Sequence, residues 1–326
     1  MNPLIACRYF KRIWGEVSKL SSKSGYSRIY HLFDYLSAFL FHGAHIFQYT
    51  VGDFWRYSNP ERSKRLTLYR LSRLFNKYND KNYVHLLKNK PEFNRFFKDF
   101  VHRGWLYVKD ATFDEFKDFV LKYQEVLIKP MGGKEGIGIR KYANAGEDEP
   151  RLRELYDNLM AEDVIVEQII EQLPSIDFGN ASVNTVRALT VCRPDGKARI
   201  MKVILRAGVG DSIVDNTALG GYYYEVDVPT GIVVSKGINK DGDLCIIHPG
   251  TDIVMPGFVV PKWEQVVETC LKAAQQIPQV AMVGWDVAIT ADSVELIEGN
   301  DSADYQGYEF VGTSGFYEKI KAFMKE

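Results

Sequence analysis

Residues 126–140, VLIKPMGGKEGIGIR, are the segment that most constrains what this chain can fold into. The segment reads as a short apolar strand, a Lys129-Pro130 pair, a glycine-rich loop that carries Lys134, and a second strand. Glycine lets the backbone approach a ligand closely, and the loop contains Gly132, Gly133, Gly136 and Gly138. Exposed backbone N–H groups beside lysine side chains are a common way to hold a polyphosphate. The segment therefore predicts a nucleotide-binding enzyme.

Two common phosphate-binding loops do not fit this segment. A Walker A loop needs G-x-x-x-x-G-K-[ST], which is absent from the sequence. A dinucleotide-binding loop needs G-x-G-x-x-G followed by a helix, whereas residues 137–142 resemble a strand. The loop is therefore expected to join two strands and lie over phosphates, although a plain surface turn would have a similar composition.

The length and composition are those of a globular protein with several domains. The 326 residues are too many for one small core, so two or three domains are expected. The cysteines are widely spaced and show no metal-binding pattern, which favours a reducing compartment. No uncharged apolar stretch reaches the ~18 residues of a membrane span, and the first residues lack the order of a signal peptide. We expect a cytoplasmic protein.

The small net charge of −1 hides a strong asymmetry along the chain. Residues 1–110 carry 20 Lys/Arg and 8 Asp/Glu, whereas residues 111–326 carry 21 and 34. A basic first third suggests an anionic partner, but attraction between the two parts of the molecule explains it equally well. No recognition element for nucleic acid accompanies the basic residues, so we expect no nucleic-acid partner.

Residues 1–105 are predicted to be a helical N-terminal region. Apolar residues recur at helical spacing at Ile29, Leu32, Phe33, Leu36 and Leu40. An interfacial helix that leans on a membrane would show this pattern, and so would a buried core helix. We favour the core helix because the nearby polar residues do not form a basic face. Peripheral membrane contact through this region stays the alternative.

After residue 105 the pattern changes to α+β. Thr112 and Glu115 form a capping box before an apolar helix, which leads into the strand 126–129. With a further helix and strand, residues 106–180 are predicted to be a small α+β unit. Residues 181–326 are predicted to form a larger, sheet-rich unit. Its expected strands cover residues 184–192, 198–206, 222–228, 232–236, 284–290 and 294–299, and its main helix covers residues 261–275.

The hairpin GWDVAITADSVELIEGN carries an acidic cluster. If residues 291–293 form a three-residue turn, Asp286 lies opposite Glu298, and Asn300 points to the same face. Two carboxylates that face each other across strands repel, and a bound cation removes this repulsion. Carboxylate and amide oxygens suit Mg²⁺, so we predict a magnesium site here, with an exposed pair of solvated acids as the alternative.

Cations are expected close to this hairpin. Arg187 and Arg206 lie in neighbouring predicted strands, and Lys202 shares a strand face with Arg206. Arginine binds phosphate or carboxylate through its planar fork, although a single arginine is more often part of a surface salt bridge. The glycine-rich loop 206–221 is long enough to suggest a function.

Taken in order, these segments resemble the ATP-grasp superfamily over about residues 106–310. The carrying segments are IKP, the glycine hairpin, VIVEQII, NTVR, RAGVGDSIVDNTALGG, GWDVAIT and ELIEGN. SVNTVRALT, VDN…GG and GWDVA…IEGN resemble more narrowly the sugar-transfer-associated ATP-grasp family of polysaccharide gene clusters, as does NDKNYVHLLKNKPEF in the helical region. The resemblance implies an ATP-grasp fold, in which two α+β subdomains sandwich ATP.

The resemblance also implies roles for single residues. Lys129 and Lys134 would hold phosphates of ATP, with the glycine loop of Gly132, Gly133 and Gly136 above them. Residues 167–170 would form the hinge whose backbone reads adenine, so Glu167, Gln168 and Ile170 are predicted nucleotide contacts. Lys202 is predicted as a further nucleotide contact. The acid that binds the ribose is left open between Glu171 and Asp177.

The implied catalytic groups surround the acidic hairpin. Asp286, Glu298 and Asn300 would bind Mg²⁺, while Arg187, Arg206 and Lys134 would stabilise the transferring phosphoryl group. This chain departs from many ATP-grasp enzymes because Trp285 stands where an arginine often precedes the metal-binding aspartate.

The expected activity is that of a carboxylate–amine ligase that uses ATP and Mg²⁺ and forms an acyl phosphate. Positioning and charge neutralisation would supply the catalysis. By resemblance, the partners would be small molecules, namely ATP and an amino acid or a sugar-linked carboxylate or amine of surface-polysaccharide synthesis. Two alternatives are a kinase that phosphorylates a hydroxyl group and a nucleotide-binding regulator without turnover.

Overall fold

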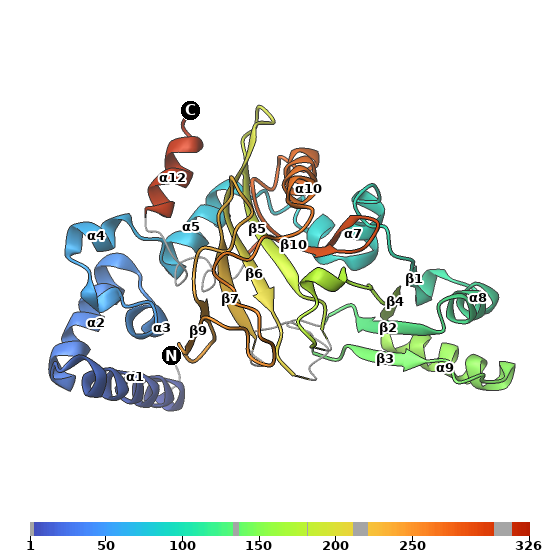
Figure 1. Ribbon diagram of the computed structural model, residues 1–326, viewed down its shortest axis with the longest axis horizontal. Coiled ribbons are helices and arrows are strands. Elements are labelled where there is room, and N and C mark those ends of the chain that lie inside the picture. The colour runs from blue at the N-terminus through green and yellow to red at the C-terminus, as the bar shows by residue number, and fades with distance from the viewer. Residues whose placement is uncertain (1–2, 133–136, 181, 211–220, 303–314) are drawn as a thin grey trace.

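The computed structural model describes residues 3–132, 137–180, 182–210, 221–302 and 315–326. Its strands form two sheets, which lie side by side along the length of the molecule in Figure 1. Lys134, Gly133 and Gly136 lie outside the described residues, as does most of the loop 206–221.

The smaller sheet has the strand order β1-β4-β2-β3 within the described chain. Its strands are β1 (Trp105–Tyr107), β2 (Glu125–Pro130), β3 (Arg140–Ala143) and β4 (Val164–Gln168). All neighbouring pairs are antiparallel. The two strands that flank the glycine loop, β2 and β3, pair with each other, as predicted. Helices α8 (Phe113–Tyr123) and α9 (Glu149–Glu162) pack on this sheet through an apolar core. The Thr112–Glu115 capping box that begins α8 is confirmed.

The larger sheet has the order β11-β10-β5-β6-β7-β8-β9 in the described chain. Its strands are β5 (Thr185–Cys192), β6 (Ala198–Ala207), β7 (Tyr222–Val226), β8 (Gly237–Ile238), β9 (Leu244–Cys245), β10 (Met282–Ile289) and β11 (Val294–Asn300). The predicted strand 232–236 is wrong, because this segment makes only isolated bridges, among them Val226 with Val233 and Ile232 with Val259.

Helices cover both faces of the larger sheet, which explains why every residue of β5 and β10 is buried. On one face lie α7 (Lys90–Phe96) and α10 (Trp263–Gln276), and on the other lie α5 (Leu68–Tyr78) and α12 (Phe316–Phe323). The short helix α6 (His85–Lys88) precedes α7. Three 3₁₀ turns complete the described elements: η1 (Phe54–Arg56), η2 (Val108–Asp110) and η3 (Pro174–Ile176).

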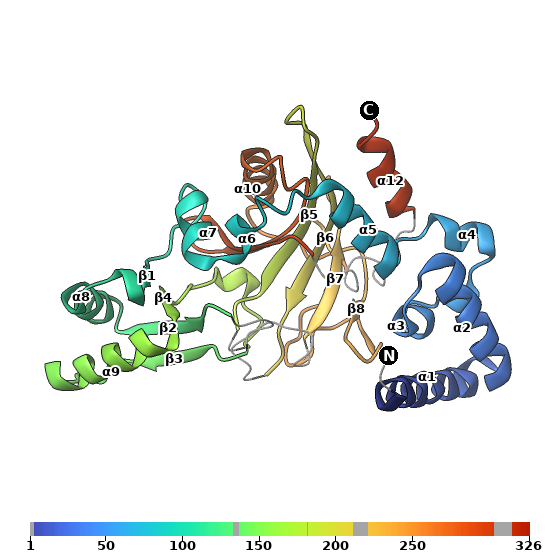
Figure 2. The same cartoon turned by 180° about the vertical axis from the view of Figure 1, so that it is seen from behind.

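The N-terminal helices form a separate cluster at one end of the molecule (Figure 2). They are α1 (Pro3–Ser24), α2 (Arg28–His42), α3 (Ile46–Thr50) and α4 (Asn59–Lys64). The first three share a small core of their own, which includes Ile13, Val17, Tyr35, Ala38 and Tyr49. No helix within the described residues has both the length and the hydropathy to cross a bilayer.

The prediction that α2 is a core helix through Ile29, Phe33 and Leu40 is wrong. The helix itself forms as expected, with Ser27 as its N-cap and Gly43 as its left-handed C-cap. However, Ile29, Phe33 and Leu40 are 63%, 67% and 71% exposed. The apolar spacing was correctly recognised as helical, but spacing alone does not say which face meets the protein.

Candidate functional site

Asp286 and Glu298 face each other across the β10–β11 hairpin, as predicted. The register of the two strands around this pair differs from the predicted one. Ile289 pairs with Val294, so the turn is one residue longer than expected, and Val287 pairs with Leu296. Ile297 is then an extra residue on β11, a β-bulge that restores the pairing of Asp286 with Glu298.

Two arginines hold the buried carboxylate of Asp286. Arg187 Nε and Nη2 donate to Asp286 Oδ1 and Oδ2 at 2.6 and 2.5 Å, and Arg206 Nη1 donates to Oδ2 at 3.0 Å. Burial raises the pKa of this carboxyl, but the two guanidinium groups outweigh burial and lower the pKa to about 2. The predicted convergence of Arg187 and Arg206 on the acidic hairpin is thus present in the geometry.

Glu298 lies at the open side of this cluster. Its side chain is 51% exposed, one oxygen lies 3.8 Å from Arg187 Nη2, and the same oxygen accepts a hydrogen bond from Asn300 Nδ2 at 3.0 Å. The surrounding protein and the negative charge of Asp286 both raise the pKa of Glu298. A cation at this position would relieve the repulsion between the two carboxylates.

The oxygen donors fit a magnesium ion that shares its coordination with phosphate. Within the part of the chain that the structure describes, no three His, Cys, Asp or Glu side chains gather into a metal-binding group. Mg²⁺ commonly needs only one or two carboxylates, since water and phosphate oxygens supply the rest. Glu298 is half exposed and hydrogen-bonded to Asn300, whereas Asp286 is buried and held by Arg187 and Arg206.

A second ionic network joins the two sheets. Arg103 donates to Glu295 Oε1 on β11 at 2.7 Å and to Glu167 Oε1 on β4 at 3.2 Å. Lys129 Nζ on β2 donates to the second oxygen of Glu167 at 2.5 Å. Burial raises the pKa of Glu167, but Arg103 and Lys129 more than offset this and hold it far below its ordinary value. The predicted phosphate-binding lysine is therefore fixed beside the junction of the sheets.

Sequence reasoning missed Lys90, Arg103 and Glu295. Lys90 Nζ donates to the Pro130 carbonyl at 3.0 Å, at the start of the glycine loop. Burial lowers the pKa of Lys90, while Glu298 nearby raises it. Lys90 thus stands between the loop and the acidic hairpin. The available signal was Glu295, a charged residue within an apolar strand, which implies a buried cation elsewhere.

The predicted hinge begins with the last two residues of β4, Glu167 and Gln168. Glu167 directs its side chain into the ionic network, and the Gln168 N–H donates to the Gly104 carbonyl at 2.8 Å. Ile170 lies beyond the last residue of the strand. Glu171 and Asp177 are both exposed, so the choice of a ribose-binding acid stays open.

Lys202 and the glycines complete the predicted set. Lys202 pairs with Glu225 on β7 rather than with the acidic hairpin. At Gly132 an added Cβ would meet no atom of the described residues within 4 Å. Gly138 has φ +81° and its Cβ would lie 2.9 Å from Pro130 Cγ, so only glycine suits this position.

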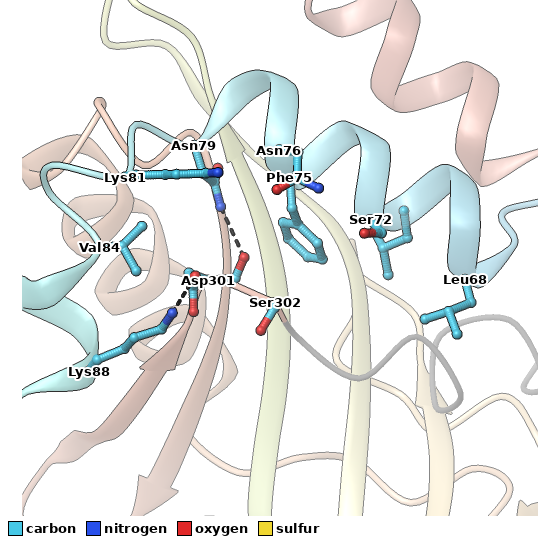
Figure 3. A pocket seen from close by; sticks show the side chains of 11 residues that line it. Leu68, Ser72, Phe75, Asn76, Asn79, Lys81, Val84, Lys88, Asp301 and Ser302 are labelled. Carbon is cyan, nitrogen blue, oxygen red and sulfur yellow. Dashed lines mark hydrogen bonds and ion pairs between the residues drawn. The ribbon is translucent and has the colours of Figure 1, made fainter. Parts of the chain in front are cut away.

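A hollow of about 440 Å³ opens where β11 ends. Figure 3 shows α5 along one side and the Asp301–Ser302 segment along the other. Leu71, Phe75 and Val84 give it an apolar wall, whereas Lys81 and Lys88 bring positive charge. Lys88 Nζ lies 3.1 Å from Asp301 Oδ2. Because Asp301 follows Asn300 directly, the hollow begins beside the candidate metal ligands.

Comparison with known proteins places the chain in a family. The family described as sugar-transfer associated ATP-grasp matches residues 69–325. A search of curated proteins gave no match. Among solved structures, the ATP-grasp ligase PsnB complexed with precursor peptide PsnA2 and AMPPNP is 15% identical, with a TM-score of 0.46 over 76% of this chain and 63% of that one.

Two further structures show similar values. N5-carboxyaminoimidazole ribonucleotide synthetase from Thermotoga maritima is 13% identical, with a TM-score of 0.45 over 80% of this chain and 56% of that one. Biotin carboxylase from Campylobacter jejuni is 12% identical, with a TM-score of 0.46 over 73% and 46%. The chain thus spans less than two thirds of the length of each of these three proteins.

The family match covers well over half of the chain and includes both sheets and every residue of the two ionic networks. The fold class predicted from the sequence is confirmed: two α+β subdomains of the ATP-grasp type, preceded by a helical N-terminal region. The protein belongs to the sugar-transfer associated ATP-grasp family.

Proposed function

We propose that this protein is an ATP- and Mg²⁺-dependent ligase that activates a carboxylate as an acyl phosphate and joins it to an amine. The observation that carries the proposal is the cluster at the β10–β11 hairpin. There, Arg187 and Arg206 converge on Asp286, and Glu298 lies directly opposite. Such a cluster combines cations for a phosphoryl group with oxygen ligands for a metal.

The reaction proceeds in two steps. A carboxylate oxygen of the first substrate attacks the γ-phosphorus of ATP, so a new O–P bond forms and ADP leaves. The amine nitrogen of the second substrate then attacks the acyl carbon. A C–N bond forms, inorganic phosphate leaves with the electron pair of the C–O bond, and the nitrogen loses a proton. Alignment and charge neutralisation lower both barriers.

The residues of the chain divide this work between the two sheets. Lys129 precedes Pro130 in β2 and Lys90 donates to the Pro130 carbonyl, and we propose that both lysines bind ATP phosphates. The buried Arg187 and Arg206 neutralise the charge of the transferring phosphoryl group. Mg²⁺ held by Glu298 and Asn300, with Asp286 as a further ligand, would screen the charge between the β- and γ-phosphates.

The hollow beside Asp301 fits the acceptor. Its apolar wall and its lysines suit a molecule with an apolar part and an anionic group, such as a carboxylate. The family description supports an acceptor connected with sugar transfer. We therefore propose an amino acid or a sugar-linked carboxylate or amine of surface-polysaccharide synthesis.

Trapping with hydroxylamine tests the chemistry. The enzyme is incubated with Mg-ATP, hydroxylamine and pooled amino acids and uronic-acid nucleotide sugars, because hydroxylamine converts an acyl phosphate into a stable hydroxamate. Hydroxamate that depends on ATP and on a carboxylate supports the ligase. A phosphorylated acceptor without hydroxamate would instead establish the kinase, and no nucleotide turnover with any acceptor would favour a regulator.

A further inference from the structure

Helix α2 exposes large apolar side chains where a helix on a globular protein usually exposes polar ones. Its exposed side carries Ile29, Phe33, Leu36, Leu40 and Phe41, and the last of these is 77% exposed. The first four residues recur every three or four positions and therefore form one stripe along the helix. Between Ile29 and Phe41, no charged side chain interrupts this stripe.

Two polar side chains of α2, His31 and Asp34, point inward instead. His31 is buried and its Nδ1 lies 3.0 Å from Tyr49 Oη, which in turn donates to Asp34 at 2.9 Å. Arg62 of α4 donates to both oxygens of Asp34 at 2.8 and 2.6 Å. This network satisfies the polar groups within the helical cluster, so the apolar stripe is the face that α2 presents outward.

The stripe does not belong to the catalytic part of the protein. It lies outside the family match, which begins at residue 69. The core of the N-terminal cluster is already formed by other residues, including Val17, Ala38 and Tyr49. In Figure 2, α2 runs along the outer edge of the molecule, at the opposite end from α8 and α9. The described residues therefore leave this stripe uncovered.

Aromatic and basic side chains surround the stripe in the sequence. Phe10 and Trp14 of α1 and Tyr26 before α2 are exposed. Between residues 9 and 45 the exposed cations are Lys11, Arg12, Lys19, Lys23 and Arg28. The two acids of this segment are occupied, since Glu16 pairs with Lys19 at 3.0 Å and Asp34 pairs with Arg62. The segment therefore offers apolar surface together with excess positive charge.

We propose that α2, with Phe10 and Trp14, lies on the surface of an anionic lipid bilayer. Apolar and aromatic side chains enter the boundary between headgroups and acyl chains, and Lys and Arg attract anionic headgroups. A second copy of the chain is disfavoured, because a symmetric contact through this face brings two sets of the same cations together. A bilayer surface supplies both the apolar layer and the negative charge.

Vesicle co-sedimentation of the full chain tests this proposal. The vesicles contain phosphatidylcholine, either alone or mixed with phosphatidylglycerol. The wild-type protein is expected to bind the anionic vesicles about tenfold or more tightly than the neutral ones. Phe33→Ser combined with Leu40→Ser is expected to lose about tenfold or more of that binding. The matched control, Val254→Ser with Val259→Ser, changes two exposed valines of the larger subdomain, 53% and 59% exposed, and should bind like the wild type.

A charge variant keeps the test decisive if the stripe variant fails to fold. Lys11→Glu combined with Lys23→Glu should weaken binding to the anionic vesicles and leave any binding to neutral ones unchanged. ATP turnover without vesicles should be the same in all these variants, which separates this proposal from the proposed function. Absence of vesicle binding by the wild type would overturn the proposal. A dimer in light scattering that the stripe variant dissociates, without vesicle binding, would assign the surface to self-association.

Discussion

Glu298 faces Asp286 because Ile297 bulges out of β11. The bulge sets one half-exposed carboxylate beside one buried carboxylate that two arginines already hold. The two acids are thus unequal: Asp286 is anchored in the protein, and Glu298 is the acid that an incoming cation meets first.

Replacement of this open carboxylate should remove activity without unfolding the protein. Glu298→Gln is expected to lower ATP turnover by about 10²-fold or more. The variant lacks a proposed ligand of Mg²⁺, and the charge of the transferring phosphoryl group is then less well neutralised. Asp292→Asn, on the exposed turn of the same hairpin, is the matched control and should leave turnover unchanged. Release of ADP measures both variants, and circular dichroism checks their fold. Normal turnover in Glu298→Gln would contradict the assignment.

Those parts of the site that depend on residues close together in the sequence were predictable. Alternation within a strand put Glu298 and Asn300 on one face, and the hairpin put Asp286 nearby, so local periodicity was enough. The bulge at Ile297 was not predictable, because a longer turn and a bulge have compensating effects on register. The assumed three-residue turn was wrong, although it led to the correct pairing of Asp286 with Glu298.

Long-range partners were beyond sequence reasoning. Arg103 meets Glu295 across 192 positions of the chain, and no local pattern encodes that distance. The prediction of which face of α2 is buried was wrong for a related reason. Its apolar spacing specifies a helix and a stripe, but the face of α2 that turns inward is the one whose Asp34 pairs with Arg62. Helices, strands and their order were largely predictable, whereas the ionic junctions between elements were not.

The junction of the sheets should depend strongly on Arg103. Arg103→Ala leaves Glu167 and Glu295 buried without this cation, and is expected to lower the free energy of unfolding by about 3–5 kcal/mol. Arg95→Ala breaks an exposed pair with Asp110, in which both side chains are 54% exposed, and should cost about 1 kcal/mol at most. Urea unfolding of both variants gives the comparison. Equal losses would mean that the network does not hold the sheets together.

Acid should weaken the same junction through Glu167. Its pKa is lowered in the folded protein, so its contribution is complete above the ordinary value of 4.5 and declines as the pH falls toward the much lower folded value. The stability difference between wild type and Glu167→Gln should therefore be largest at neutral pH and shrink at about pH 3. Unfolding by urea at several pH values measures the difference. A gap that grows on acidification would show that the sign is wrong.

Lys90 should matter for nucleotide use although it lies in the helical region. Lys90→Met removes a cation between the glycine loop and Glu298, and is expected to reduce kcat/KM for ATP by about tenfold or more. Lys98→Met changes an exposed lysine just after α7 and serves as the control. Steady-state kinetics with varied ATP tests this, and equal kinetics in the two variants would remove Lys90 from the site.

The hollow beside β11 should govern the acceptor rather than ATP. Ser72→Phe places a ring in that space and is expected to raise KM for the acceptor about tenfold, with the affinity for ATP unchanged. Arg73→Phe adds a ring at a neighbouring exposed position that does not line the hollow. Calorimetric titration with a non-hydrolysable ATP analogue separates the two effects. A loss of nucleotide binding in Ser72→Phe would place the hollow in the ATP site.

The most direct test of the ligase chemistry is the ratio of inorganic phosphate to ADP released with Mg-ATP and the pooled acceptors, corrected for the background without acceptor. An acyl-phosphate ligase releases one phosphate for each ADP, and only when carboxylate and amine are both present. We expect a ratio near one that depends on both acceptors, and loss of both products in Glu298→Gln. ADP released without phosphate would contradict the account, because the acceptor would then keep the phosphoryl group.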